Sequence, residues 1–205
     1  MQKELANILR DKVRTLPFAD LAMGIGQTVE VKELDSNNEV PIRRRFPVGY
    51  DEAIKDEAGR VKEINLFPDQ SRKSIIFFED YGVTSIPGIR GAHGFSSSLR
   101  LLSWMNRAKL VASGYAEISA RCQSAIVGLL CHQQPQNVSP FIRLKVELTR
   151  IPPQDAALFG RYTFDETVRQ YLRPPFEFFG IDLTSTFYVS DRCLDEIPWT
   201  AGICH

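Results

Sequence analysis

Residues 96–106 read Ser-Ser-Ser-Leu-Arg-Leu-Leu-Ser-Trp-Met-Asn, and this stretch decides the fold class. Successive side chains of a β-strand point to opposite faces of a sheet, so its larger apolar residues would divide between the two faces. One face would hold Leu99, Leu101 and Met105, and the other Leu102 and Trp104. A strand that is apolar on both faces is typical of the interior of a sheet. The stretch therefore predicts a strand near the middle of a sheet.

Other segments have the pattern of strands that would join this sheet. Residues 74–78 form a short apolar run, and residues 28–32 and 40–46 are predicted to pair as a hairpin around a polar turn. Two later segments, 142–149 and 178–189, alternate between apolar and polar residues. Their apolar sides would hold Ile142, Leu144, Val146 and Leu148 in the first, and Ile181, Leu183, Phe187 and Val189 in the second. Strands with one buried and one wet face are typical of an antiparallel sheet with helices on a single side.

Two helices are expected beside this sheet. Apolar residues recur at three- and four-residue spacing from Leu5 to Leu16, and Pro17 is a natural end. A second helix should cover about Tyr115 to Leu130. The sequence therefore predicts an α+β fold, with a mostly antiparallel sheet flanked by an N-terminal helix and a second, central helix. One domain would span residues 1–205, because this length suits a single core.

Two long connections would leave this domain as loops. Residues 50–73 are polar and weakly patterned, and residues 82–95 contain Pro87 and several glycines. Both are longer than a compact domain normally uses to link its elements. Loops of this length often carry function, so these two are predicted to be interface loops.

Composition excludes several classes of protein. The 25 basic residues balance the 25 acidic ones, and 43% of the chain is hydrophobic, which excludes a disordered chain and argues against a coat of nucleic acid. No apolar stretch approaches about 18 residues, so we expect no membrane contact. The start, Met1 to Glu4, lacks the apolar core of a signal peptide, and four cysteines do not make a disulfide scaffold. A reduced compartment is the expectation.

The balanced charge is unevenly distributed. Residues 86–150 carry 8 basic and 2 acidic side chains, whereas residues 151–205 carry 4 basic and 8 acidic ones. These segments could face each other within one fold. They could also lie on opposite faces, so that copies attract head to tail into a ring or filament. The sequence leaves both arrangements open.

The residues that could support chemistry do not form a known motif. The cysteines at 122, 131, 193 and 204 lack the close pairs of a zinc site, so Cys122 is expected in the core, and a Cys193–Cys204 bridge stays possible in an oxidising environment. The acidic pairs at 51–52 and 56–57 do not match a calcium loop and are expected on a solvated surface. His93 could act as a base in an enzyme, but its loop lacks a phosphate-binding or nucleophile-elbow pattern. No cofactor or metal is expected.

Two groups of residues could instead contact partners. The densest basic run, Arg43, Arg44 and Arg45, could face phosphates or form a solvated strand edge, and Arg90 adds a further basic candidate. Residues 160–180 are rich in aromatic residues interrupted by arginines and prolines. Such a segment could lay aromatic side chains onto a neighbouring subunit or pack on its own domain. The candidate interface aromatics are Tyr162, Phe164, Tyr171 and Phe176.

Four stretches together resemble a family. They are Ser97–Asn106, Phe159–Thr167, Gln170–Leu183 and Tyr188–Cys193, and they look like parts of small structural proteins encoded by tailed phages and prophages of Bacteroidetes-type hosts. The order of elements, with a helix before the sheet, is similar to that of tail terminators and related neck or tail-completion proteins.

The resemblance implies a structural role without catalysis. Copies would form a ring, commonly a hexamer, that caps the tail tube and joins it to the neck connector. Its partners would be copies of itself, neighbouring tail-tube and neck proteins and, non-specifically, packaged DNA. The protein would be assembled in the bacterial host cytoplasm and reside in the virion.

Two other classes of function stay open. The chain could be a non-catalytic protein-binding module of a cellular or injection-apparatus complex. It could also be a hydrolase that uses His93, which would require a carboxylate within hydrogen-bond reach in a pocket. A dedicated nucleic-acid reader is not favoured, because basic and stacking aromatic residues do not interleave in one motif.

Overall fold

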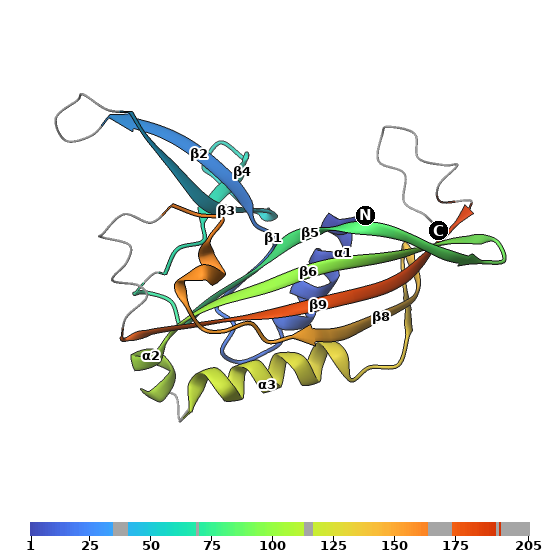
Figure 1. Cartoon of the computed structure of the whole chain (residues 1–205). Coiled ribbons are helices and arrows are strands. Elements are labelled where there is room, and N and C mark those ends of the chain that lie inside the picture. Colours follow the sequence, from blue (N-terminus) through green and yellow to red (C-terminus); the bar gives the residue numbers. More distant parts are fainter. Residues whose placement is uncertain (35–40, 69, 113–116, 164–173, 192, 194–205) are drawn as a thin grey trace.

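The computed structural model describes residues 1–34, 41–68, 70–112, 117–163, 174–191 and 193. The fold is α+β, as predicted, and consists of a six-stranded and a three-stranded sheet with helices beside the larger one (Figure 1). In chain order the elements are α1 (Gln2–Val13), β1 (Leu21–Ile25), β2 (Gln27–Leu34), β3 (Pro41–Lys55), β4 (Val61–Asn65), β5 (Ser74–Ile89), β6 (Ala92–Asn106), α2 (Arg107–Ala112), α3 (Ile118–Cys131), β7 (Gln136–Val138), β8 (Phe141–Arg150), the 3₁₀ helix η1 (Ala156–Phe159) and β9 (Phe176–Ser190). Among the described residues, no helix has the length and apolar character needed to cross a membrane.

The larger sheet has the strand order β1-β5-β6-β9-β8-β7, and all its pairs are antiparallel except β1 with β5. The predicted central strand is β6, which pairs along its whole length with β9 and also with β5. Its position inside the sheet explains why its last six residues are buried whichever face they point to. The prediction for residues 96–106 is therefore confirmed.

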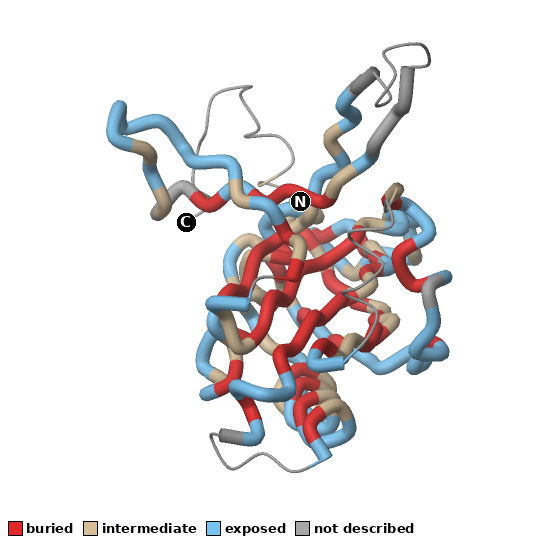
Figure 2. Tube along the Cα trace, turned by 90° about the vertical axis from the view of Figure 1, so that its left-hand side faces the viewer, coloured by how far each residue is buried: buried red, intermediate tan, exposed pale blue. Residues whose placement is uncertain are grey.

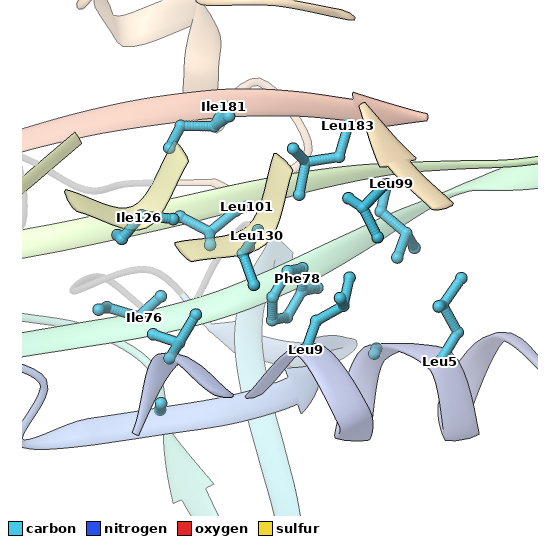
Figure 3. Packing of buried hydrophobic residues seen from close by; sticks show 14 of the residues in the cluster. Leu5, Leu9, Ile76, Phe78, Leu99, Leu101, Ile126, Leu130, Ile181 and Leu183 are labelled. Carbon is cyan, nitrogen blue, oxygen red and sulfur yellow. The ribbon is translucent and has the colours of Figure 1, made fainter. Parts of the chain in front are cut away.

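One face of the larger sheet packs against α1 and α3 and forms the main core. Figure 3 shows Leu5 and Leu9 of α1 opposite sheet side chains such as Phe78, with Ile126 and Leu130 of α3 beside them. Each fully buried side chain of this size contributes about 1.5–3 kcal/mol relative to an exposed one. The two predicted helices are thus confirmed, and the short helix α2 is an addition.

The opposite face of the sheet is only partly exposed to solvent. The sequence predicted helices on one face and solvent on the whole of the other, so this expectation is corrected. A second core cluster covers the part of this face around Trp104 and includes Leu102, Phe159 and Tyr162. The chain at Pro152 and Leu158 lies close against β9. A side chain at Gly180 of β9 would meet Leu158 and Pro152 at 2.8 and 2.9 Å. The glycine is therefore required there by the close approach of η1 and the chain before it.

The predicted excursion at residues 50–73 is mostly exposed, as expected, but much of it is a strand pair, so the expectation of a loop is wrong. β3 continues through Lys55, and β4 pairs back onto it, which completes a three-stranded sheet in the order β2-β3-β4. The acidic pairs do not form one solvated surface either. Asp51 is buried and accepts a hydrogen bond from Arg14, the residue that follows α1. Asp56 accepts main-chain hydrogen bonds from Ala58 and Arg60 in the turn.

The predicted loop at residues 82–95 is also wrong, because these residues form the far end of the β5–β6 hairpin. Pro87 and the glycines are accommodated by two register shifts, between Asp80 and Val83 and between Ile86 and Ile89. Such bulges let an edge strand tolerate residues that weaken regular pairing. Figure 2 shows buried residues concentrated in the body, while the segments that project from it are mostly exposed.

The alternation predicted for β8 holds only in part. Leu144 and Val146 are buried, but Leu148 is 39% exposed and Ile142 is only half-buried. Phe141 takes the buried place expected for Ile142, because the register against β9 shifts between Ile142 and Lys145. A bulge changes which residues face the core on either side of it, and alternation in the sequence does not reveal where it falls.

Candidate interaction surface

The larger sheet has two open edges, one on each side. β1 pairs with β5 only through Phe78, and no described strand pairs with the outer side of β5 beyond that residue. On the opposite side, β7 pairs with β8 only through Leu144, which leaves Lys145–Arg150 without an outer neighbour among the described strands. Unpaired main-chain N–H and C=O groups at such edges are ready templates for another strand.

The usable part of the β5 edge is short and well defined. Arg161 donates to the main-chain carbonyl of Asp80 at 3.0 Å and so covers the start of the edge. Pro87 has no N–H and ends it. Between these residues lie Val83–Ile86, a regularly paired stretch of β5 that contains neither proline nor glycine. We call Val83–Ile86 the β5 edge and Lys145–Arg150 the β8 edge.

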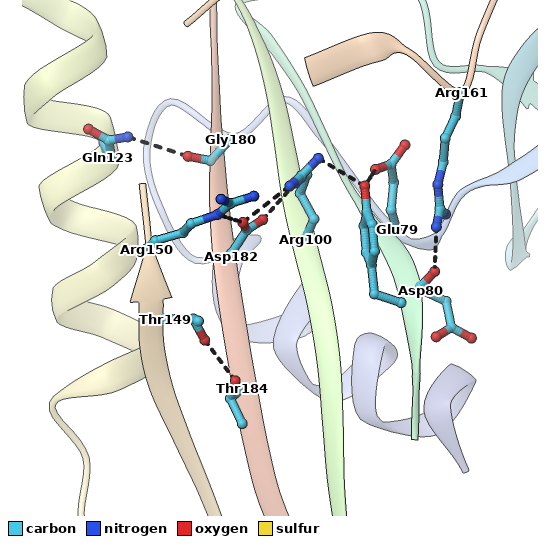
Figure 4. A network of polar contacts seen from close by, with 11 residues as sticks. Glu79, Asp80, Arg100, Gln123, Thr149, Arg150, Arg161, Gly180, Asp182 and Thr184 are labelled. Carbon is cyan, nitrogen blue, oxygen red and sulfur yellow. Dashed lines mark hydrogen bonds and ion pairs between the residues drawn. The ribbon is translucent and has the colours of Figure 1, made fainter. Parts of the chain in front are cut away.

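A polar network crosses four neighbouring strands on the face away from the helices (Figure 4). Arg100 of β6 donates to both carboxylate oxygens of Asp182 on β9, at 2.6 and 3.1 Å, and Arg150 of β8 donates to the same carboxylate at 2.6 Å. Arg100 also donates to the Tyr81 hydroxyl at 2.9 Å, and that hydroxyl donates to the buried Glu79 of β5 at 3.1 Å. The network ties the strands between the two edges together.

The network also brings described residues of the two charged segments of the chain together. Arg100 and Arg150 belong to the basic segment 86–150, and Asp182 belongs to the acidic segment 151–205. Arg107 of the basic segment likewise pairs with Glu177 of the acidic segment, at 3.4 Å. Described residues of the two segments therefore face each other within one fold, because β9 lies between β6 and β8. The charge asymmetry consequently gives little support for attraction between copies.

The charge of Asp182 should make the stability of the fold depend on pH. Burial by itself raises the pKa of Asp182, but hydrogen bonds from Arg100 and Arg150 outweigh it, and the pKa lies below its usual value. A carboxylate with a lowered pKa stabilises the folded state above its unfolded pKa, about 4, and this contribution is lost as pH falls through the folded value.

We therefore expect Asp182→Asn to lower the free energy of unfolding at pH 7 by about 1.5–3 kcal/mol, the usual range for hydrogen bonds to a charged group. The deficit should shrink as pH falls below about 4. Urea unfolding from pH 7 to pH 3 measures both effects, and Asp11→Asn, at a 59% exposed carboxylate, is the matched control. A deficit that is equal at both ends of the pH range would contradict the assigned role of the charge.

The predicted basic residues lie in two separate places. Arg43, Arg44 and Arg45 lie in β3, where their backbone pairs with Lys32, Val31 and Glu30 of β2. The Arg45 side chain is exposed, and its carbonyl accepts a hydrogen bond from the Thr163 N–H at 3.0 Å. The side chains of Arg43 and Arg44 lie outside the described residues. Arg90 is exposed in the turn of the β5–β6 hairpin, so it does not join the arginine run.

The predicted aromatic residues that the structure describes are buried in their own chain. Tyr162 is 6% exposed, and its ring centroid lies 6.4 Å from that of Phe77. Burial, together with the charge of Glu79 and a hydrogen bond to it, raises the pKa of Tyr162. Phe176 is 7% exposed and begins β9. Both are therefore packing residues, while Phe164 and Tyr171 fall outside the described residues.

The candidates for chemistry do not converge on an enclosed site. His93 does approach a carboxylate, with 3.3 Å between its Nε2 and Asp191 Oδ1, but the side chains are 63% and 51% exposed. In the described part of the chain, no three metal-ligating side chains gather. Cys122 is buried on α3, as predicted, and burial raises the pKa of its thiol to about 11. Cys193 is disulfide-bonded, and its partner lies outside the described residues.

Sequence reasoning missed both open edges and the polar network. The signal for the network was present, since Glu79, Arg100, Arg150 and Asp182 are charged residues within or at the end of predicted strands. Their partners could not be assigned without the strand order, because β9 is paired with β6 and β8 from distant parts of the chain.

The larger sheet thus presents two open edges, and a polar network ties together the strands between them. Comparisons with models of protein families, with curated proteins and with solved structures found no match for this chain. Its function is therefore inferred from its residues and their arrangement.

Proposed function

We propose that this chain is a structural subunit of a tailed-phage particle, of the tail-terminator or neck type, that joins copies of itself into a ring. The observation that supports self-association is the pair of open edges on one sheet. The β5 edge and the β8 edge lie on opposite sides of that sheet and differ in sequence. The β5 edge of one copy would pair with the β8 edge of the next.

Such a contact is heterologous, so it adds copies in one direction and closes into a ring where the rotation between copies permits. Main-chain hydrogen bonds would provide the attraction, and alternate side chains would fix the register. A four-residue edge makes each contact weak. Closure lets every subunit hold two neighbours at once, which raises the stability of the whole ring far above that of one contact.

The sheet suits a ring subunit because a force on one edge would be transmitted to the other edge through the paired strands. β5, β6, β9 and β8 are joined by main-chain pairing and by the Arg100–Asp182–Arg150 bridge. In the particle the ring would join the tail tube to the neck connector, with packaged DNA passing through it. The three-stranded sheet, which extends from the body, would contact the adjoining rings (Figure 1).

Light scattering on the purified chain tests self-association. We expect a mass on the order of six times 23.2 kDa. Because edge pairing relies on main-chain hydrogen bonds and not on ion pairs, the mass should change little between low and high salt. An assembly that dissociates in high salt would contradict edge pairing. A 23.2 kDa monomer at both salts would contradict self-association and favour a module that binds a foreign strand.

A further inference from the structure

The far end of the larger sheet contains a groove that the edges do not use. It has a volume of about 770 Å³ and lies between the turn of the β5–β6 hairpin and the β7–β8 pair. Two arginines, Arg90 and Arg143, line it together with Gly91 and the apolar residues Ile89 and Ile142. Arg90 comes from the hairpin turn and Arg143 from β8, so two distant parts of the sequence supply the two positive charges.

Arg143 is held in an unusual backbone conformation. Its φ is 51°, in the left-handed region that residues with a side chain rarely adopt. The register of β8 against β9 shifts at this point, and the Arg143 N–H donates to Asn137 Oδ1 at 3.0 Å. A bulge of this kind changes the direction in which a side chain points. Strained positions of this kind cluster at sites that hold a ligand.

Both guanidinium groups are available to a ligand. Arg90 and Arg143 are exposed, and neither forms an ion pair with any carboxylate in the described ranges. Asp191, whose N–H donates to the Gly91 carbonyl beside the groove, has its Oδ1 3.3 Å from His93 Nε2. Gly91 has a φ of 77°, and a side chain there would meet nothing within 4 Å, so an incoming group can approach the turn closely.

We propose that this groove binds backbone phosphates of duplex DNA, with Arg90 and Arg143 as the contacts. Guanidinium groups match phosphate oxygens in charge and geometry. The lining offers no aromatic ring on which a base could stack, and the Asn137 side chain is engaged with the main chain. The contact is therefore independent of base sequence, as suits DNA that passes through a ring. The inference deepens the proposed function and rests on it.

Titration of a fluorescently labelled 20-base-pair duplex at several salt concentrations tests the groove. For each phosphate contact removed, the slope of log K against log salt should fall by about 0.9. Arg90→Gln and Arg143→Gly should each lower the slope by about this amount and weaken binding, and the double variant should lose both contacts. Arg121→Gln, at an exposed arginine of α3, is the matched control and should bind as the original chain does.

Arg143→Gly separates binding from folding. Glycine adopts a positive φ without strain, so this variant should melt at the same or a slightly higher temperature while it loses DNA affinity. Unchanged affinity and slope in the double variant would overturn the proposal, as would absence of duplex binding by the original chain at 50 mM salt. Equal binding of poly-glutamate would reassign the groove to an acidic protein partner.

Light scattering of the same variants keeps the two proposals apart. Loss of DNA binding with an unchanged mass supports the groove and leaves the ring intact. A monomer that still binds duplex DNA through both arginines would contradict the ring and retain the groove as a phosphate site.

Discussion

A proline in the β5 edge is expected to convert the ring into a 23.2 kDa monomer. Neighbouring N–H groups of a strand point to opposite sides, so one of Thr84 and Ser85 directs its N–H toward β6 and the other toward the open edge. Proline at the position whose N–H faces the open edge removes an edge donor and leaves the β5–β6 ladder intact. Making both Thr84→Pro and Ser85→Pro guarantees that one variant tests the edge alone.

Light scattering gives the mass of each variant, and thermal melting shows which one has kept its ladder. The variant with an unchanged melting temperature should be the monomer. Thr84→Ala and Ser85→Ala keep the N–H and are expected to assemble normally. Glu147→Pro and Leu148→Pro apply the same test to the β8 edge, where the same loss of assembly is expected. If all four proline variants retain the full mass, pairing of these edges is wrong.

The second large effect concerns Trp104, which is expected to anchor the smaller core cluster. The side chain is 2% exposed and stacks on Phe159, with 4.2 Å between ring centroids and 12° between planes. Phe178 lies against it at 5.5 Å. Trp104→Ala removes these contacts and leaves a cavity, so the free energy of unfolding should fall by about 3–5 kcal/mol.

Urea unfolding measures the loss, and Val111→Ala is the control because Val111 is 51% exposed. The control should change stability by no more than about 0.5 kcal/mol. The same cluster includes Leu66, which follows β4, and Tyr162, so Trp104→Ala should also loosen the three-stranded sheet. A loss below about 1 kcal/mol would show that the cluster contributes little to holding the two sheets together.

The proposed contacts and the stability of the fold therefore involve different faces and edges of one sheet. The helix face holds the main core, half of the other face holds the smaller core, and the remainder carries the polar network. The edges and the groove bear little of the packing. Variants at Arg90 and Arg143, and whichever β5-edge proline keeps the ladder, can consequently test DNA binding and assembly without unfolding the protein.

The sequence by itself determined the α+β class, the two main helices and the central strand. Leu99, Leu101 and Met105 lie in the main core and Leu102 and Trp104 in the smaller one, as strict alternation predicts. The same holds for Ile181, Leu183, Phe187 and Val189 of β9. These predictions succeeded because side-chain direction along a regular strand or helix depends only on local geometry.

Only the tertiary structure decided the β5–β6 hairpin, the bulge at Arg143 and the strand order. Residues 82–95 have the glycines and proline of a loop, but pairing with β6 keeps them extended around two bulges. The open edges and the polar network follow from the order β1-β5-β6-β9-β8-β7. That order places residues side by side that are up to 98 positions apart, such as Ala92 and Ser190. Long-range pairing depends on how all strands pack together, and no local pattern contains that information.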